Sequence, residues 1–140
     1  MATVALMTIP DQLDAMTGAL EPIGLEIPGL QVTRYFNNNP SPPSIDIYPA
    51  DPFQAGAGFG IGNVKLFWTV RARAFLADPQ AASDTLYRLL DVNDPASVEA
   101  ALAGVEAVVG NDGTVSGLIR WADDPTGDMI GVQWRIGMWT

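Results

Sequence analysis

The clearest pattern in the chain is an alternation of apolar and mostly polar side chains between residues 63 and 76. Successive side chains of a β-strand point to opposite faces of the sheet, so this spacing predicts a long strand with one face in the core. The residues expected on the core face are Val64, Leu66, Trp68, Val70, Ala72, Ala74 and Leu76.

The C-terminal third alternates in the same way over residues 113–122 and 129–139. The residues between these two segments, 123–128, are Asp, Asp, Pro, Thr, Gly and Asp, which are typical of a turn. The three segments together predict a β-hairpin. Shorter strands are expected at 29–36 and 44–48.

Glycines stand at alternate positions near the end of residues 51–62, which predicts a flexible loop or arm. We name Gly56, Gly58, Phe59 and Gly60 as a candidate contact arm. A phosphate-binding loop would need a strand before the glycines and a helix after them. Here the predicted strand follows the glycines, so the pattern favours a loop over a phosphate site.

Three segments begin with residues that are typical of a helix start. Thr8 is a suitable N-cap with Pro10 in the first turn, and the pairs Asp78–Pro79 and Asp94–Pro95 repeat this signal. Apolar residues at helical spacing follow each of them. The predicted helices span residues 8–20, 78–90 and 94–105.

The order of these elements predicts an α+β fold. Strands that follow one another in hairpins favour a mainly antiparallel or mixed sheet, with the helices packed on one face. The chain has 140 residues, of which 48% are hydrophobic, and this is enough for one domain over residues 1–140 with a core of its own.

The composition argues against an enzyme. The chain has no cysteine and no histidine, which removes thiolate nucleophiles, the usual zinc ligands and histidine acid–base catalysis. Asp123 and Asp124 are adjacent in a predicted turn, where solvated carboxylates are expected rather than a catalytic pair. We therefore expect no catalytic residues, no cofactor and no metal. Asp46 lies between Ile45 and Ile47 on a predicted strand, so we expect its side chain to face solvent.

The formal net charge of the chain is −9, and so acidic a protein has no strong reason to bind a phosphate backbone. No apolar run approaches the roughly 18 residues of a membrane span. The first ten residues contain no basic residue, so we expect no signal peptide there and no association with a membrane. These observations predict a protein of the cytoplasm or of a particle built there.

The few basic residues are placed unevenly. Four of seven lie on the polar side of predicted strands, whereas the acidic residues lie mostly in helices and turns. Arginines that coat an exposed sheet would explain this pattern, and so would a head-to-tail assembly in which a basic sheet face meets a neighbour's acidic edge. The candidate subunit-interface residues are Lys65, Arg71, Arg73 and Arg135, together with Trp139 near the end of its strand.

The order of the predicted elements and the sequences of several segments resemble a known family. The informative segments are the proline-rich residues 39–49, the strand that ends in RARAF at 71–75, DPQAASDTLYRLL at 78–90 and DPASVEAAL at 94–102. Over nearly its whole length the chain resembles the tail terminator proteins of long-tailed (siphovirus) bacteriophages, particularly those that infect actinobacteria.

The resemblance implies a virion structural protein that forms a homohexameric ring on the head-proximal end of the tail tube. Its expected partners are copies of itself, the major tail tube protein and a head-closure or connector protein, and genome DNA would pass through an acidic lumen. A head-to-tail connector (stopper) or tail-completion protein is the alternative within the same class. From another class, a small ligand-binding accessory domain remains open, and a hydrolase has little support without histidine or cysteine.

Overall fold

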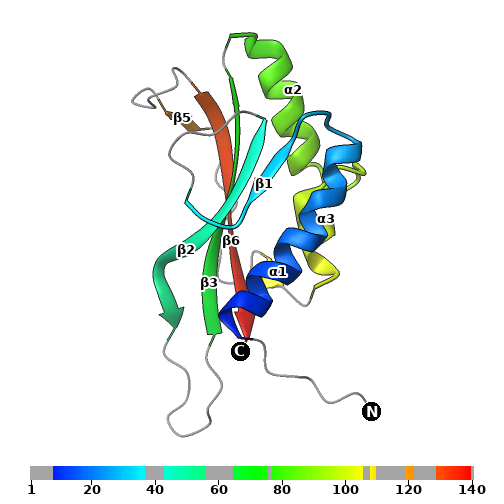
Figure 1. Ribbon diagram of the computed structural model, residues 1–140. Helices are drawn as coiled ribbons and strands as arrows, with labels where there is room; N and C mark the ends of the chain where they lie inside the picture. The colour runs from blue at the N-terminus through cyan, green and yellow to red at the C-terminus, as the bar shows by residue number, and fades with distance from the viewer. Residues whose placement is uncertain are drawn as a thin grey trace, which may run out of the picture.

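A mixed β-sheet of six strands carries all the helices on one of its faces, as Figure 1 shows. The computed structural model describes residues 8–36, 43–55, 65–75, 77–105, 108–109, 119–121 and 129–139. The predicted α+β class, with a mixed sheet and one helical layer, is confirmed.

The helices are α1 (Ile9–Leu20), the short 3-10 helix η1 (Glu21–Leu25), α2 (Pro79–Leu90) and α3 (Val98–Ala103). The strands are β1 (Gln31–Thr33), β2 (Ser44–Ala55), β3 (Lys65–Phe75), β4 (Val108–Val109), β5 (Ile119–Trp121) and β6 (Met129–Trp139). No helix in the described ranges is long and apolar enough to cross a bilayer.

The two most strongly alternating segments of the sequence are neighbours in the centre of the sheet. β3 and β6 pair antiparallel without interruption, from Lys65 opposite Trp139 to Phe75 opposite Met129. β2 lies on the other side of β3, and β1 runs parallel to β2 at that edge, whereas β4 and β5 pair with the far side of β6. β4 was not predicted, since two residues are too few to show an alternation.

β2 is longer than predicted. It continues through Pro49 to Ala55, with an irregularity in its register against β3 between Pro49 and Gln54. This irregularity lets Phe53 pack edge-to-face on Trp68, with ring centroids 4.9 Å apart. Residues 51–55, predicted to start a loop, therefore belong to the strand, while the candidate arm from Gly56 to Gly60 lies outside the described residues.

β1 is shorter than predicted. The segment 29–36 contributes only Gln31–Thr33 to the sheet, and Gly29 precedes it in the left-handed region with φ of 81°. A glycine tolerates that conformation at little cost, so the chain can turn there into the strand. Tyr35 and Phe36, which follow the strand, are more than half exposed.

The predicted helix starts are confirmed at α1 and α2 but not at α3. Thr8 and Asp11 form a capping box, and the Asp78 carboxylate accepts a hydrogen bond from the Ala81 N–H at 3.1 Å. α3 begins later than the predicted Asp94, because Ser97 is its N-cap. The Asp94 carboxylate instead accepts hydrogen bonds from Arg88 and from the Ala96 N–H.

The core lies between the helices and the even-numbered face of β3 and β6. Trp68 and Trp134 are each 1% exposed, which confirms the predicted core position of Trp68. One polar side chain is buried with them, since the Trp68 Nε1–H donates to Gln12 Oε1 over 2.8 Å. The helical residues that complete this core include Met16, Leu20, Leu86, Leu89, Val98 and Leu102.

Candidate interaction surface on the outer face of the sheet

The face of the sheet that points away from the helices carries the predicted basic residues. Lys65, Arg71 and Arg73 occupy odd positions on β3, and Arg135 pairs with Thr69 in the register of β6, so all four share that face. Asp46 and Tyr48 join them from β2, opposite Arg71 and Thr69. We call these residues, together with Phe67, the outer sheet face.

Asp46 is not exposed on this face, and the prediction that it faces solvent is wrong. The register places it directly opposite Arg71, whose Nη2 and Nε donate to the two carboxylate oxygens over 2.6 and 3.1 Å. Arg73 Nη2 lies 3.5 Å from the same carboxylate. Only 1% of Asp46, 6% of Arg71 and 3% of Arg73 is exposed, so this is a buried cluster of one acid and two bases.

Aromatic rings pack over the Asp46–Arg71 pair. The Arg71 guanidinium lies 4.7 Å from the centre of the Phe36 ring and 5.1 Å from that of Tyr48, and the two rings meet edge-to-face at 5.0 Å. Burial raises the pKa of Tyr48, and Arg71 partly offsets this effect, so the phenol stays neutral well above pH 7. Its hydroxyl oxygen accepts from the Gln133 amide over 3.5 Å.

These contacts change the part that two predicted interface residues can play. Arg71 and Arg73 are buried within the single chain and bound to Asp46, so they stabilise the subunit itself. A direct contact from Arg71 to another subunit would require the cover formed by Phe36 to move. Sequence reasoning missed this because the alternation shows which face a residue occupies and not what covers it.

The two remaining basic residues of the outer sheet face flank one aromatic ring. Lys65 Nζ lies 5.5 Å from the centre of the Phe67 ring, and Arg135 Cζ lies 4.1 Å from it. Both cationic residues are half-buried, whereas Phe67 is 4% exposed. Gly137 makes room for this arrangement, because a Cβ there would stand 2.6 Å from Lys65 Cε and 3.1 Å from Phe67 Cε1. The backbone of Trp139 pairs with Lys65 at the same end of the sheet, and its side chain is outside the described part.

The described charges divide between the two sides of the molecule. The outer sheet face, as defined above, carries four basic residues and Asp46, a formal charge of +3, while Asp51 on β2 and Arg120 on β5 belong to neither set. Residues 8–36 and 77–105 contain the helices and the edge strand β1, and we call them the helix layer. They hold nine carboxylates against Arg34 and Arg88, a formal charge of −7. Most of the described basic residues therefore lie on strands, and most of the described carboxylates lie in the helix layer.

Both arginines of the helix layer are paired within it. Arg34 forms an ion pair with Asp14. Arg88 donates from Nε and Nη2 to the two oxygens of Asp94, each over 3.2 Å, and from Nη1 to the carbonyl of Glu26 over 3.0 Å. The hydrogen bond from Arg88, helped by the Ala96 N–H, lowers the pKa of Asp94. Arg88 thus joins η1, α2 and the turn before α3.

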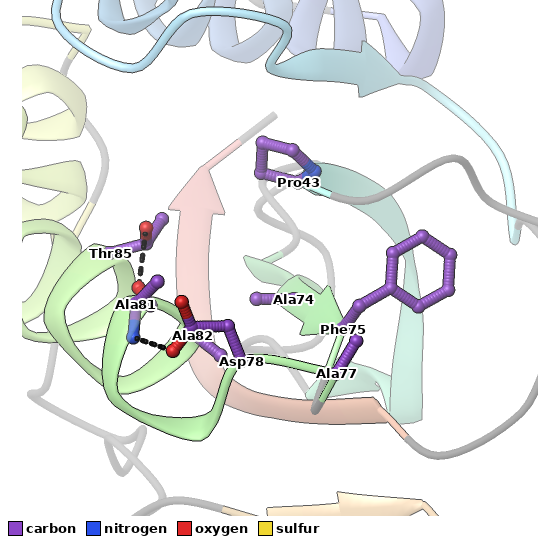
Figure 2. A pocket seen from close by; sticks show the side chains of 8 residues that line it. All are labelled: Pro43, Ala74, Phe75, Ala77, Asp78, Ala81, Ala82 and Thr85. Atoms are coloured by element: carbon purple, nitrogen blue, oxygen red, sulfur yellow. Dashed lines mark hydrogen bonds between the residues drawn. The ribbon is translucent and has the colours of Figure 1, made fainter.

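An open hollow of about 270 Å³ lies where the end of β3 passes into the first turn of α2. Figure 2 shows that small apolar side chains dominate its wall, with Phe75 and Pro43 at its side. Its polar side chains are used inside the helix, since Asp78 caps Ala81 and the Thr85 hydroxyl donates to the Ala81 carbonyl over 3.0 Å. The hollow therefore offers a ligand mainly apolar contact.

In the part of the chain that the structure describes, no three acidic side chains lie close enough together to bind a metal ion. No protein-family model matches the chain, and no curated protein is significantly similar to it in sequence.

Proposed function

We propose that this protein is a structural subunit that assembles head to tail with copies of itself into a ring. The observation that carries the proposal is the separation of charge, with the half-buried Lys65 and Arg135 on the outer sheet face and a formal charge of −7 on the helix layer of the described residues. Unlike surfaces on one subunit make a heterologous contact, and such contacts close into a ring when the rotation between neighbours permits.

We further propose that this ring has six copies and caps the head-proximal end of a bacteriophage tail tube, in agreement with the resemblance of the sequence. The ring would occupy the surface to which the next tube ring adds, and it would offer its other side to a head-closure protein. An acidic lumen would let DNA pass without binding its phosphates, because like charges repel.

The net charge of the assembly requires that the contacts between its subunits be locally attractive. Six copies of a chain with formal charge −9 carry −54, so neighbours repel one another at long range. Local contacts between opposite charges must outweigh this repulsion if the ring is stable. The assembly should therefore depend on the basic residues that reach the subunit surface, Lys65 and Arg135, more than on the buried Arg71 and Arg73.

Negative-stain micrographs with native mass spectrometry test the ring. Six copies of a 14.9 kDa chain give about 89 kDa, and the particles should show a central opening. Tube protein polymerised in the presence of the ring should form shorter tubes that carry the ring at one end. A protein that stays monomeric at all concentrations would contradict the assembly. Tubes of unchanged length would contradict the capping role but not the ring.

A further inference from the structure

One exposed stripe on α2 and its C-cap residue combines carboxylates with an aromatic side chain. Asp84, Tyr87 and Asp91 follow one another at intervals of three and four residues, so they lie on the same side of the helix. The opposite side of α2 faces the core through Ala82, Leu86 and Leu89. The stripe consequently points away from the core. The helix α2 itself lies on the side of the sheet opposite the outer sheet face (Figure 1).

The stripe is available for contact in the described chain. Tyr87 is 54% exposed, and Asp84 and Asp91 are exposed as well. Among the described residues no side chain pairs with Asp84, and the Asp91 carboxylate accepts only the nearby Asn93 N–H, over 3.0 Å. Arg88, which is next to the stripe, is held by Asp94 and Glu26. An exposed tyrosine between two carboxylates suits the centre of a polar protein contact.

The outer sheet face carries a matching pair of charges. Lys65 Nζ and Arg135 Cζ lie on the Phe67 ring at 5.5 and 4.1 Å from its centre, so the sum of these distances, 9.6 Å, is the largest separation they can have. Asp84 and Asp91 are seven residues apart, which is about 10.5 Å along a helix axis. The two carboxylates and the two cations therefore carry opposite charges, and each pair lies within about 10.5 Å.

We propose that the Asp84–Tyr87–Asp91 stripe of one copy docks on Lys65 and Arg135 of the next copy. This contact rests on the proposed head-to-tail assembly and specifies its two surfaces. Each carboxylate meets one cation, and Tyr87 fills the space between the two ion pairs. Since the surfaces lie on opposite sides of the subunit, the contact repeats along a series of copies.

Charge reversal tests this contact. One variant carries Asp84→Lys with Asp91→Lys, and a second carries Lys65→Glu with Arg135→Glu. Each places like charges in every contact, which should raise the dissociation constant of the assembly at least about a hundredfold. Mixed in equal amounts, the two variants should assemble again, because unlike surfaces then meet in alternating copies. Native mass spectrometry should find both chains in equal number.

The control is Glu21→Lys with Glu99→Lys, which makes the same change of charge elsewhere in the helix layer. It should assemble at least as well as the wild-type chain, since it only reduces the net negative charge. Circular dichroism checks that all variants fold. The neutral variant Asp84→Asn with Asp91→Asn should weaken the assembly to an intermediate degree, and it does so without introducing lysine at either site.

The outcomes separate this contact from the function on which it rests. Restored assembly on mixing supports the contact. Variants that assemble separately like the wild-type chain overturn the contact and leave the ring standing. Open filaments that the same reversals dissolve support the contact and overturn the ring. A wild-type chain that stays monomeric overturns both.

Discussion

Asp46 and Arg71 face each other directly across β2 and β3 and share two hydrogen bonds, although both lie on the side of the sheet away from the helices. An ion pair on that side would ordinarily be solvated and worth little. Here both residues are at most 6% exposed, so each needs the other to offset its lost hydration. The outer sheet face thus contains a buried polar cluster of Asp46, Arg71 and Arg73.

Replacement of Asp46 by asparagine should destabilise the subunit strongly. The change leaves Arg71 and Arg73 buried without the carboxylate that both contact, and breaking a buried pair in this way costs about 3–5 kcal/mol. Urea unfolding measures the free energy. The exposed Glu21→Gln should change it by no more than about 0.5 kcal/mol. An Asp46→Asn chain as stable as this control would show that the cluster is solvated.

Gln12→Leu should weaken the attachment of α1 to the sheet. The substitution removes the oxygen that accepts from Trp68 Nε1 over 2.8 Å, and a buried donor that loses its partner costs about 1–3 kcal/mol. Thermal unfolding measures the loss, and tryptophan fluorescence should change because the indole environment changes. If the midpoint of unfolding stays within a degree or so of the wild-type value, the hydrogen bond contributes nothing to stability.

Asp94 should make stability depend on pH in the acidic range. Its pKa is lowered in the folded chain, so its contribution is present above its unfolded pKa of about 3.9 and is lost as the pH falls through the lower folded value. A titration of the carboxyl carbon by NMR should report a pKa below the ordinary one. Arg88→Gln should return this pKa toward normal, because Arg88 is the main cause of the shift. If the pKa of Asp94 were unchanged in the Arg88→Gln variant, a group other than Arg88 would be the cause of its shift.

Gly137→Ala should displace Lys65 from the Phe67 ring. The new methyl group would stand 2.6 Å from Lys65 Cε, and the flexible end of that side chain can move away. We expect a loss of stability of roughly 0.5–1 kcal/mol, the size of an exposed cation–π contact. Gly137→Val should cost more, since it adds two further methyl groups near the Phe67 ring, whose Cε1 would already be 3.1 Å from the Cβ atom. Equal unfolding free energies for both variants would contradict this packing.

Much of the fold follows from local patterns in the sequence. The alternation of residues 65–75 and 129–139 predicted β3 and β6, because one face of each strand packs on an apolar core. Thr8 and Asp78 predicted the starts of α1 and α2, because a helix end needs a side chain to bond its first N–H groups.

The polar contacts could not be predicted in the same way. The Asp46–Arg71 pair depends on the register of β2 against β3, and Arg71 is covered by Phe36; neither feature is encoded in the spacing of residues along one strand. Gln12 is polar at an inward helical position, and only the three-dimensional structure shows Trp68 as its partner. The same signal could have identified both residues, namely a polar residue among apolar neighbours in a predicted strand or helix.

The most direct test of self-assembly through opposite charges is sedimentation of the purified chain at two salt concentrations. At about 0.05 M salt the protein should sediment as a particle of about six copies. At about 1 M, where charges are screened beyond about 3 Å, it should sediment mainly as smaller species. A single 14.9 kDa species at both concentrations would contradict the account, and so would an assembly that high salt leaves intact or strengthens.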